Sequence, residues 1–250
     1  NGDWSSDVCS SDLDFVYYDL DTINREKQLT LLENGMPQAL ADGEFVVYFQ
    51  PKVRVDTRTL VGAEALIRWK RDGKIISPAD FIPIAERTGF IMKLDMFVLE
   101  HTCAMIKQWQ ESGKRTVPVS VNFSKIHLRF PHLAEKIMNV INRYGIEPHY
   151  LEVEFTETAY TDDFNAIKQA IIDLKSYGLM VSMDDFGTGY SSLALLKDLD
   201  FDILKLDKSL AGSDDDARGQ VVLENILHMA QELSMTTVCE IGRASCRERV

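Results

Sequence analysis

Short apolar runs that end in a carboxylate or an amide constrain this chain more than any other feature. Such runs are followed by Glu64, by Asn122, by Glu154 and by the pair Asp184 and Asp185. Each run is typical of a buried strand. In a parallel barrel the carboxyl ends of the strands meet on one face, where chemistry takes place. Carboxylates gathered there would repel one another without a cation, and oxygen ligands suit Mg²⁺ or Mn²⁺. The pattern therefore predicts metal-assisted chemistry on an anionic substrate.

The alternation of strand-like and helix-like segments predicts the fold class. Repeated strand–helix units are typical of a parallel α/β sheet with crossover helices. The first two strands are expected to form a hairpin, because residues 57–59 can turn the chain tightly. The segment Gln50-Pro51-Lys52 is expected to interrupt the first strand. The expected strands cover residues 45–53, 60–67, 117–123, 151–154, 179–183, 203–206 and 236–239. The expected helices cover residues 21–42, 94–110, 133–144, 163–177, 191–196 and 217–233, and another begins at Pro78.

Size, charge and cysteine content exclude several classes of function. A chain of 250 residues is long enough for one large domain, and it contains no apolar run near the ~18 residues of a membrane span. Its formal net charge of −12 argues against binding long nucleic acid, although a small phosphate ligand held by metal remains compatible. No cysteine pair shows zinc spacing, and the few cysteines fit a reducing cytoplasm. The four cysteines are Cys9, Cys103, Cys239 and Cys246.

Both ends of the chain look foreign to the rest. Residues 7–13 and 240–250 can be encoded by strings that resemble the two adaptors of a sequencing read. We therefore expect residues 1–13 and 241–250 to be translated adaptor and leave them out of the fold prediction. The alternative is that both ends are genuine polar tails. Resequencing the source locus separates the two readings.

The segment Asp184-Asp185-Phe186-Gly187 is the sharpest local motif. Adjacent aspartates at a strand end can each face a metal ion, and one of them can bridge two ions. Two metal ions ~3.5–4 Å apart stabilise both the attacking and the leaving oxygen of a phosphoryl displacement. The alternative is a plain strand-to-turn junction, because Asp and Gly both favour turns.

Each other polar residue has a structural alternative. Glu64 lies inside an apolar strand, where a charge is costly unless it is paired or metal-bound. Its alternative is an ion pair with Arg68, four residues on and on the same face of an extended strand. Asn122 could simply bond the backbone. Lys205 could be the buried partner of a carboxylate, or it could orient a nucleophilic water. Glu154 and Glu157 could be exposed and cap the next helix.

Five segments in a fixed order carry most of these polar residues. They are Glu64-Ala65-Leu66, Val121-Asn122-Phe123-Ser124, Glu154-Phe155-Thr156-Glu157, Asp184-Asp185-Phe186-Gly187-Thr188-Gly189-Tyr190-Ser191-Ser192-Leu193 and Lys205-Leu206-Asp207. Together they resemble the EAL-domain family of bacterial phosphodiesterases, which hydrolyse cyclic di-GMP to linear pGpG. The resemblance runs from about residue 44 to residue 240. It implies a modified TIM barrel whose first strand is antiparallel.

The resemblance also implies roles for single residues. It implies metal ligands at Glu64, Asn122, Glu154 and Asp184, with Asp185 serving a second Mg²⁺ or Mn²⁺ ion. Lys205 would hold the attacking water, Glu240 would be the general base, and Glu157 would brace the loop after the two aspartates. In this family that loop contributes to a homodimer. The positions that match substrate contacts are Gln50, Leu66 and Arg68, and a guanidinium fork suits phosphate oxygens.

The resemblance stops at Glu240, on the suspected adaptor junction. The eighth strand of the barrel and the final helices are not matched, so we expect a barrel truncated before that strand. Residues 14–43 resemble the linker helix between a GGDEF domain and an EAL domain, which makes 44–240 the EAL domain. We expect the chain to be a fragment of a longer signalling protein with GGDEF and sensory domains. The fragment itself is expected to be inactive, because its base lacks a supporting strand. A membrane anchor in the parent stays open.

Two other functions compete with the phosphodiesterase. One is a catalytically inactive EAL domain that senses cyclic di-GMP or acts as a scaffold. Inactive members usually lose metal ligands, and none is lost in this sequence, which favours the enzyme. The other is an enolase-like Mg²⁺ barrel that uses a lysine or histidine base. Lys205 could serve there, but Arg68 and paired metals suit phosphate better.

Overall fold

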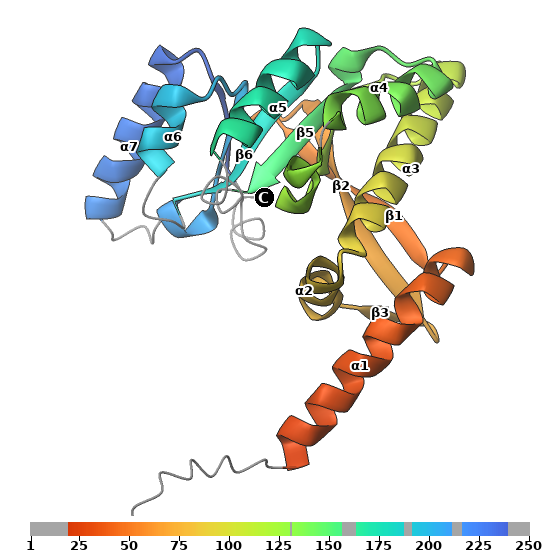
Figure 1. Ribbon diagram of the computed structural model, residues 1–250. Coiled ribbons are helices and arrows are strands. Elements are labelled where there is room, and N and C mark those ends of the chain that lie inside the picture. The colour runs from red at the N-terminus through yellow and green to blue at the C-terminus, as the bar shows by residue number, and fades with distance from the viewer. Residues whose placement is uncertain (1–19, 131, 157–163, 188–191, 212–216, 240–250) are drawn as a thin grey trace, which may run out of the picture.

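The computed structural model describes residues 20–130, 132–156, 164–187, 192–211 and 217–239 (Figure 1). The two suspected adaptor segments lie outside these ranges, as do Glu157 and Glu240. Within them, every helix is too short or too polar to cross a lipid bilayer.

One curved sheet forms the centre of the protein. Its path runs β1-β2-β4-β5-β6-β7-β8, and β3 pairs with β2 beside this path. The hairpin of β1 and β2 is antiparallel, whereas each later neighbour in the path is parallel. The strands are β1 (Phe45–Val53), β2 (Leu60–Arg71), β3 (Lys74–Ile76), β4 (Val119–Asn122), β5 (Leu151–Thr156), β6 (Met180–Phe186), β7 (Ile203–Leu206) and β8 (Thr236–Cys239). The prediction of a modified TIM barrel with an antiparallel first strand is thereby confirmed. Within the described part of the chain, β1 and β8 are the edges of an open sheet.

Helices cover the outer face of the sheet, as Figure 1 shows. They are α3 (Ile91–Glu111), α4 (Leu133–Tyr144), α5 (Phe164–Ser176), α6 (Ser192–Asp198) and α7 (Ala217–Glu232). The larger core lies between them and the strands, where Val121, Val153 and Val181 pack against helix residues such as Ile137. Because side chains alternate along a strand, the residues on either side of each of these valines point to the inner face. That inner face is polar.

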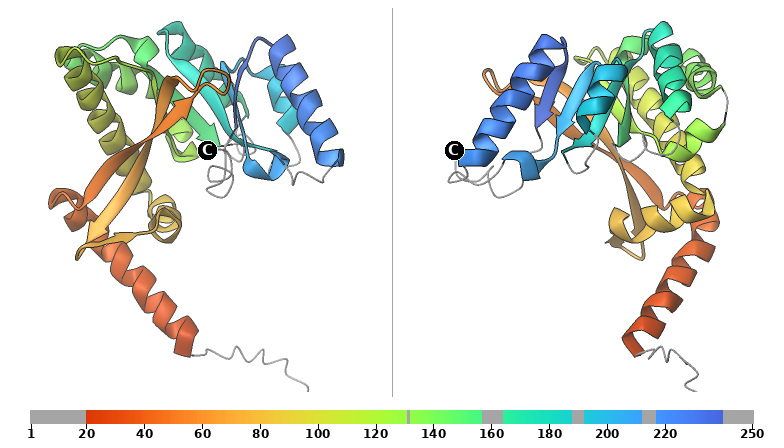
Figure 2. Two further views of the ribbon diagram at one scale, coloured as in Figure 1. Left: turned by 180° about the vertical axis from the view of Figure 1, so that it is seen from behind. Right: turned by 60° about the vertical axis from the view of Figure 1, so that its left-hand side comes forward.

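A smaller core lies at the far end of the β1–β2 hairpin, which extends beyond the parallel strands (Figure 2). Phe45 stacks on Trp69 with ring centroids 5.0 Å apart, and Phe81 meets both rings edge-on. Helices α1 (Leu20–Ala41) and α2 (Pro78–Thr88) supply the rest of this core, including the buried Met36. The end of α1 therefore packs directly on the hairpin.

The structure differs from the sequence-based expectation in a few places. The first strand is not interrupted at Gln50-Pro51-Lys52 but continues to Val53, with a register shift after Lys52. Proline is tolerated there because β1 pairs only with β2 among the described strands. The N–H that Pro51 lacks is therefore not needed for hydrogen bonds to a second neighbouring strand. Strand β3 is only three residues long and was not predicted. Strand β6 runs on through both aspartates to Phe186.

Candidate metal centre

Three carboxylates meet on the polar inner face of the sheet. Glu64 of β2, Glu154 of β5 and Asp184 of β6 each place one oxygen within 4.8 Å of the others. Glu154 and Asp184 are buried, and Glu64 is partly buried. The convergence follows from the parallel register, which brings the carboxyl ends of these strands to one edge of the sheet. The predicted gathering of Glu64, Glu154 and Asp184 is thus present in the structure.

The ammonium group of Lys205 lies among the three carboxylates. Its Nζ is 3.2 Å from Glu64 Oε2, 3.1 Å from Glu154 Oε2 and 2.9 Å from Asp184 Oδ2. Lys205 is only 1% exposed. Burial acts to lower the pKa of Lys205, but the three carboxylates outweigh it and raise that pKa above its usual value. Of the two alternatives raised for Lys205, the structure shows the buried partner of carboxylates.

The carboxylates respond differently to their surroundings. For Glu154, burial acts to raise the pKa, but the ammonium groups of Lys205 and Lys52 outweigh it, and the pKa is lowered. For Glu64, burial and the charge of Glu154 raise the pKa, only partly opposed by Lys205. Glu154 is therefore the more firmly ionised of these two glutamates.

Asn122 joins the group from β4. Its amide nitrogen donates a hydrogen bond to Glu64 Oε1 at 3.0 Å. The carbonyl oxygen of the same amide is the atom that could ligate a cation. The loop that follows Asn122 is held by Asp95 of α3. This carboxylate accepts hydrogen bonds from the backbone N–H of Ser124 at 2.9 Å and from His127 at 3.1 Å.

Asp184 and Asp185 face different surroundings because the strand is distorted between them. Asp185 has a φ of 57°, in the left-handed region, and the register of β6 against β7 shifts between Met183 and Phe186. Its backbone N–H donates to Asp184 Oδ1 at 2.9 Å. A bulge of this kind re-aims side chains near an active site. Asp184 enters the carboxylate group, whereas Asp185 is not among its three members.

The donor set fits a divalent cation. All candidate ligand atoms are oxygens, which suits Mg²⁺ or Mn²⁺ and disfavours soft metals. The three carboxylates and Glu152 face two ammonium groups, those of Lys205 and Lys52, which leaves two negative charges that one divalent ion would neutralise. Glu64, Glu154, Asp184 and Asn122 are the residues that could hold it.

The predicted substrate contacts lie along the hairpin beside this group. Gln50 on β1 is exposed and is the Cα partner of Glu64, while Leu66 and Arg68 lie further along β2 and are partly buried. Arg68 Nη1 donates to the carbonyl of Ile67 at 2.8 Å. The alternative that Glu64 pairs with Arg68 is therefore wrong, because Glu64 forms its ion pair with Lys205. Glu157 and Glu240 lie outside the described residues.

The sequence analysis missed a second pair of charged residues on the inner face. Lys52 of β1 forms ion pairs with Glu152 at 3.1 Å and with Glu154 at 3.0 Å. One signal was available, because Glu152 precedes Glu154 by two residues and so shares its face of the strand. Lys52 gave no such signal, since its segment was interpreted as a break in the strand.

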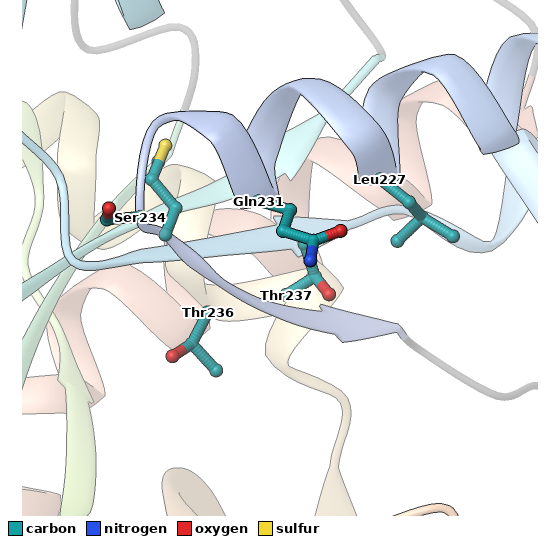
Figure 3. A pocket seen from close by; sticks show the side chains of 6 residues that line it. Leu227, Gln231, Ser234, Thr236 and Thr237 are labelled. Atoms are coloured by element: carbon teal, nitrogen blue, oxygen red, sulfur yellow. The ribbon is translucent and has the colours of Figure 1, made fainter.

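A separate pocket of about 500 Å³ lies at the β8 edge, between that strand and α7 (Figure 3). Its lining residues are Leu227, Gln231, Ser234, Met235, Thr236 and Thr237. None of these side chains is an acid or a base near neutral pH, and none belongs to the carboxylate group. The pocket therefore offers no chemistry comparable to the inner face.

Comparison with known proteins identifies relatives of the chain. A family model described as EAL domain matches residues 33–241. The bifunctional diguanylate cyclase/cyclic di-GMP phosphodiesterase MucR of Pseudomonas aeruginosa is 34% identical over 222 residues, which cover 87% of this chain and 32% of that protein. The cyclic di-GMP phosphodiesterase PA2567 of the same organism is 33% identical over 224 residues, covering 86% and 37% of the two chains. This chain thus spans about a third of the length of these curated relatives.

A solved structure agrees with the sequence comparison. The structure of PaMucR phosphodiesterase in a c-di-GMP complex superposes with a TM-score of 0.78 and 31% sequence identity. The match covers 85% of this chain and 88% of that one. The likeness therefore extends over most of both chains.

Proposed function

Because this chain belongs to the EAL domain family, we propose that it hydrolyses cyclic di-GMP to linear pGpG with Mg²⁺ or Mn²⁺ as cofactor. The observation that carries the proposal is the group of three carboxylates and one asparagine on the inner face of the sheet. Names of the relatives support it, since MucR and PA2567 are both called cyclic di-GMP phosphodiesterases. The bacterial second messenger is the proposed substrate.

The proposed roles follow from position and chemistry. Glu64, Asn122, Glu154 and Asp184 would hold a first cation, and Asp185 would serve a second. Two bound cations would stabilise the attacking and leaving oxygens of the displacement at phosphorus. These ligands come from four strands of one rigid sheet, so the fold itself fixes their spacing.

The other proposed roles belong to residues around the centre. Lys205 would donate a hydrogen bond that orients the attacking water, and Glu240 would take its proton as general base. Glu157 would brace the loop after the two aspartates. Arg68 would clamp a phosphate once its guanidinium leaves the carbonyl of Ile67, because its planar fork matches two phosphate oxygens. Gln50 and Leu66 would contact the rest of the dinucleotide.

An EAL domain that binds cyclic di-GMP without cleaving it is the second candidate. The described part of the chain retains all four first-cation ligands, and they lie together on the inner face. This arrangement favours hydrolysis over binding alone. The enolase-like alternative is not retained, because the family match covers the entire sheet.

The proposed setting follows from the relatives rather than from the described residues. We propose that the chain works in the cytoplasm, beside GGDEF and sensory domains. A homodimer through the loop after Asp185 is part of this proposal. Residues 188–191 of that loop lie outside the described ranges.

A hydrolysis assay tests the proposed function. Two proteins are compared, the 250-residue chain and the product of the complete gene. Each is incubated with cyclic di-GMP and Mg²⁺ or Mn²⁺, and pGpG is measured by chromatography. We expect pGpG from the product of the complete gene and its loss in Glu64→Ala. Glu224→Gln, which removes an exposed carboxylate on α7, is the matched control and should retain full turnover. Binding of cyclic di-GMP without any pGpG would instead support the sensor.

A further inference from the structure

Lys52 reaches from the antiparallel strand β1 to two glutamates of β5. Its Nζ donates to both carboxylate oxygens of Glu152 at 3.1 Å and to Glu154 Oε1 at 3.0 Å. The other oxygen of Glu154, Oε2, accepts from Lys205 at 3.1 Å. The two oxygens of one fully buried carboxylate are thus held by two different lysines.

The local fold prepares this reach. Lys52 is the Cα partner of Gly62, which precedes Glu64 by two residues. A Cβ at Gly62 would lie 3.5 Å from Lys52 Cδ and 3.2 Å from the carbonyl oxygen of Pro118. The aliphatic stem of Lys52 therefore lies across a position without a side chain. A Cβ at Gly62 would make an ordinary van der Waals contact with that stem, and its tighter contact would be with the carbonyl of Pro118.

Stability alone does not explain a charged pair at this depth. The side chains of Lys52 and Glu152 are 12% and 4% exposed. Buried ion pairs are often no more stabilising than apolar side chains of the same volume, because both charges lose their water. The contacts instead run from Glu152 through Lys52 to Glu154 and on to Lys205, in alternating charge. This order ends at the carboxylate group.

We propose that Lys52 is a positioning residue of the metal centre, which fixes one oxygen of Glu154 so that the other faces the cation. Glu152 cancels the charge of Lys52, so that a lysine can lie beside a cation site without repelling the cation. The inference rests on the proposed function only in requiring a divalent cation at the carboxylate group. Its first readout is metal binding and not turnover.

The double variant Lys52→Met/Glu152→Gln tests positioning separately from charge. Burial raises the pKa of Glu152 to about 7, so the titration is run well above neutral pH. There the double variant removes one positive and one negative charge, and the net charge of the inner face stays the same. Free Mn²⁺ is measured by electron paramagnetic resonance during a titration, with folding checked by circular dichroism. We expect Mn²⁺ affinity to fall about tenfold or more, the size of effect that residues supporting metal ligands have. Unchanged affinity in the folded double variant would overturn the proposal.

A second variant covers the case in which the double variant does not fold. Lys52→Arg keeps the charge, but a planar guanidinium cannot reproduce the three contacts of one ammonium. We expect Mn²⁺ affinity to fall by at least about threefold, whereas a pure charge effect predicts no change. Lys70→Met is the matched control. It removes an exposed lysine of the same hairpin, which lies over Tyr48, and should leave Mn²⁺ affinity unchanged.

The same set of proteins separates this inference from the proposed function. If the unaltered protein binds Mn²⁺ and cleaves cyclic di-GMP while both Lys52 variants bind Mn²⁺ normally, only the inference fails. If the variants lose Mn²⁺ while the unaltered protein shows no turnover, the inference holds and the proposed function fails. If the unaltered protein binds no Mn²⁺, both fail.

Discussion

At the scale of the residue, the central feature is a set of buried carboxylates whose negative charge exceeds the positive charge of the lysines beside them. Lys205 neutralises part of the charge of Glu64, Glu154 and Asp184, and the remaining charge makes a divalent cation a favourable partner. The opposite pKa shifts of Glu64 and Glu154 express this shortage, since burial raises the first while two lysines lower the second. The effect of removing one member of the group on the stability of the metal-free protein can therefore be predicted.

Replacing Asp184 by alanine removes one metal ligand and one repelling charge. We expect turnover to fall by more than about a hundredfold, while the unfolding temperature of the metal-free protein changes little, because Lys205 keeps Glu64 and Glu154 as partners. Glu64→Ala should behave in the same way. Turnover assays and thermal unfolding in a chelator measure both effects. A large loss of metal-free stability would mean that the residue is structural.

Replacing Lys205 by methionine, in contrast, should lower the stability of the metal-free protein. It leaves three close carboxylates without their shared ammonium, and unpaired buried charge costs about 3–5 kcal/mol. We expect the metal-free variant to lose stability of this order in urea unfolding. Added Mg²⁺ should restore part of it by taking the place of the ammonium charge. Equal stability of variant and parent without metal would contradict this account.

At the scale of the element, the strands were predictable and their irregularities were not. Short runs rich in β-branched and apolar residues located β4, β5, β7 and β8 closely, because such residues favour strands even where the inner face carries polar side chains. Strand β6 extends past the predicted end because a left-handed Asp185 keeps Phe186 paired with β7, a feature set by tertiary contacts. The role of Lys52 depends on Glu152, a hundred residues away, which no local pattern reveals.

Gly187, the residue after β6, provides a prediction about this strand end. Its φ is +100°, and a Cβ there would lie 2.5 Å from Leu210 Cδ1. We expect Gly187→Ala to cost about 2 kcal/mol of folding free energy, measured by urea unfolding, because it combines backbone strain with a clash. Gly73→Ala is the matched control, since Gly73 has a φ of +74° with nothing within 4 Å of its Cβ position. Equal costs for both would exclude the contact with Leu210.

At the scale of the whole molecule, one sheet serves two cores and a polar inner face. The parallel strands pack their outer residues against α3 to α7, and the hairpin end packs a smaller core with α1 and α2. The fold class was predictable from the order of strands and helices. The smaller core was not, because Trp69 packs with Phe45 of β1 and Phe81 of α2, and no local periodicity reveals these contacts.

Cys103 connects the larger core to the stability of the whole protein. Burial, aided by the charge of Glu100, raises the pKa of its thiol from 9.0 to about 12. The unfolded chain therefore loses this proton first, so the contribution of the protonated thiol is fully present below pH 9 and is lost as pH rises toward 12. Between pH 8 and 10.5 we expect an extra loss of roughly 2 kcal/mol that Cys103→Ala lacks. Urea unfolding at both pH values measures the difference, and parallel losses in the two proteins would refute it.

The dependence of hydrolysis on metal tests the central claim most directly. The protein encoded by the complete gene is stripped of metal with a chelator. The formation of pGpG from cyclic di-GMP is then measured as Mn²⁺ is added back, and bound Mn²⁺ is measured in the same samples. The account predicts no turnover after stripping and a return of turnover that follows bound Mn²⁺, with both absent in Asp184→Ala. Full turnover after exhaustive chelation, or normal Mn²⁺ binding by Asp184→Ala, would contradict it.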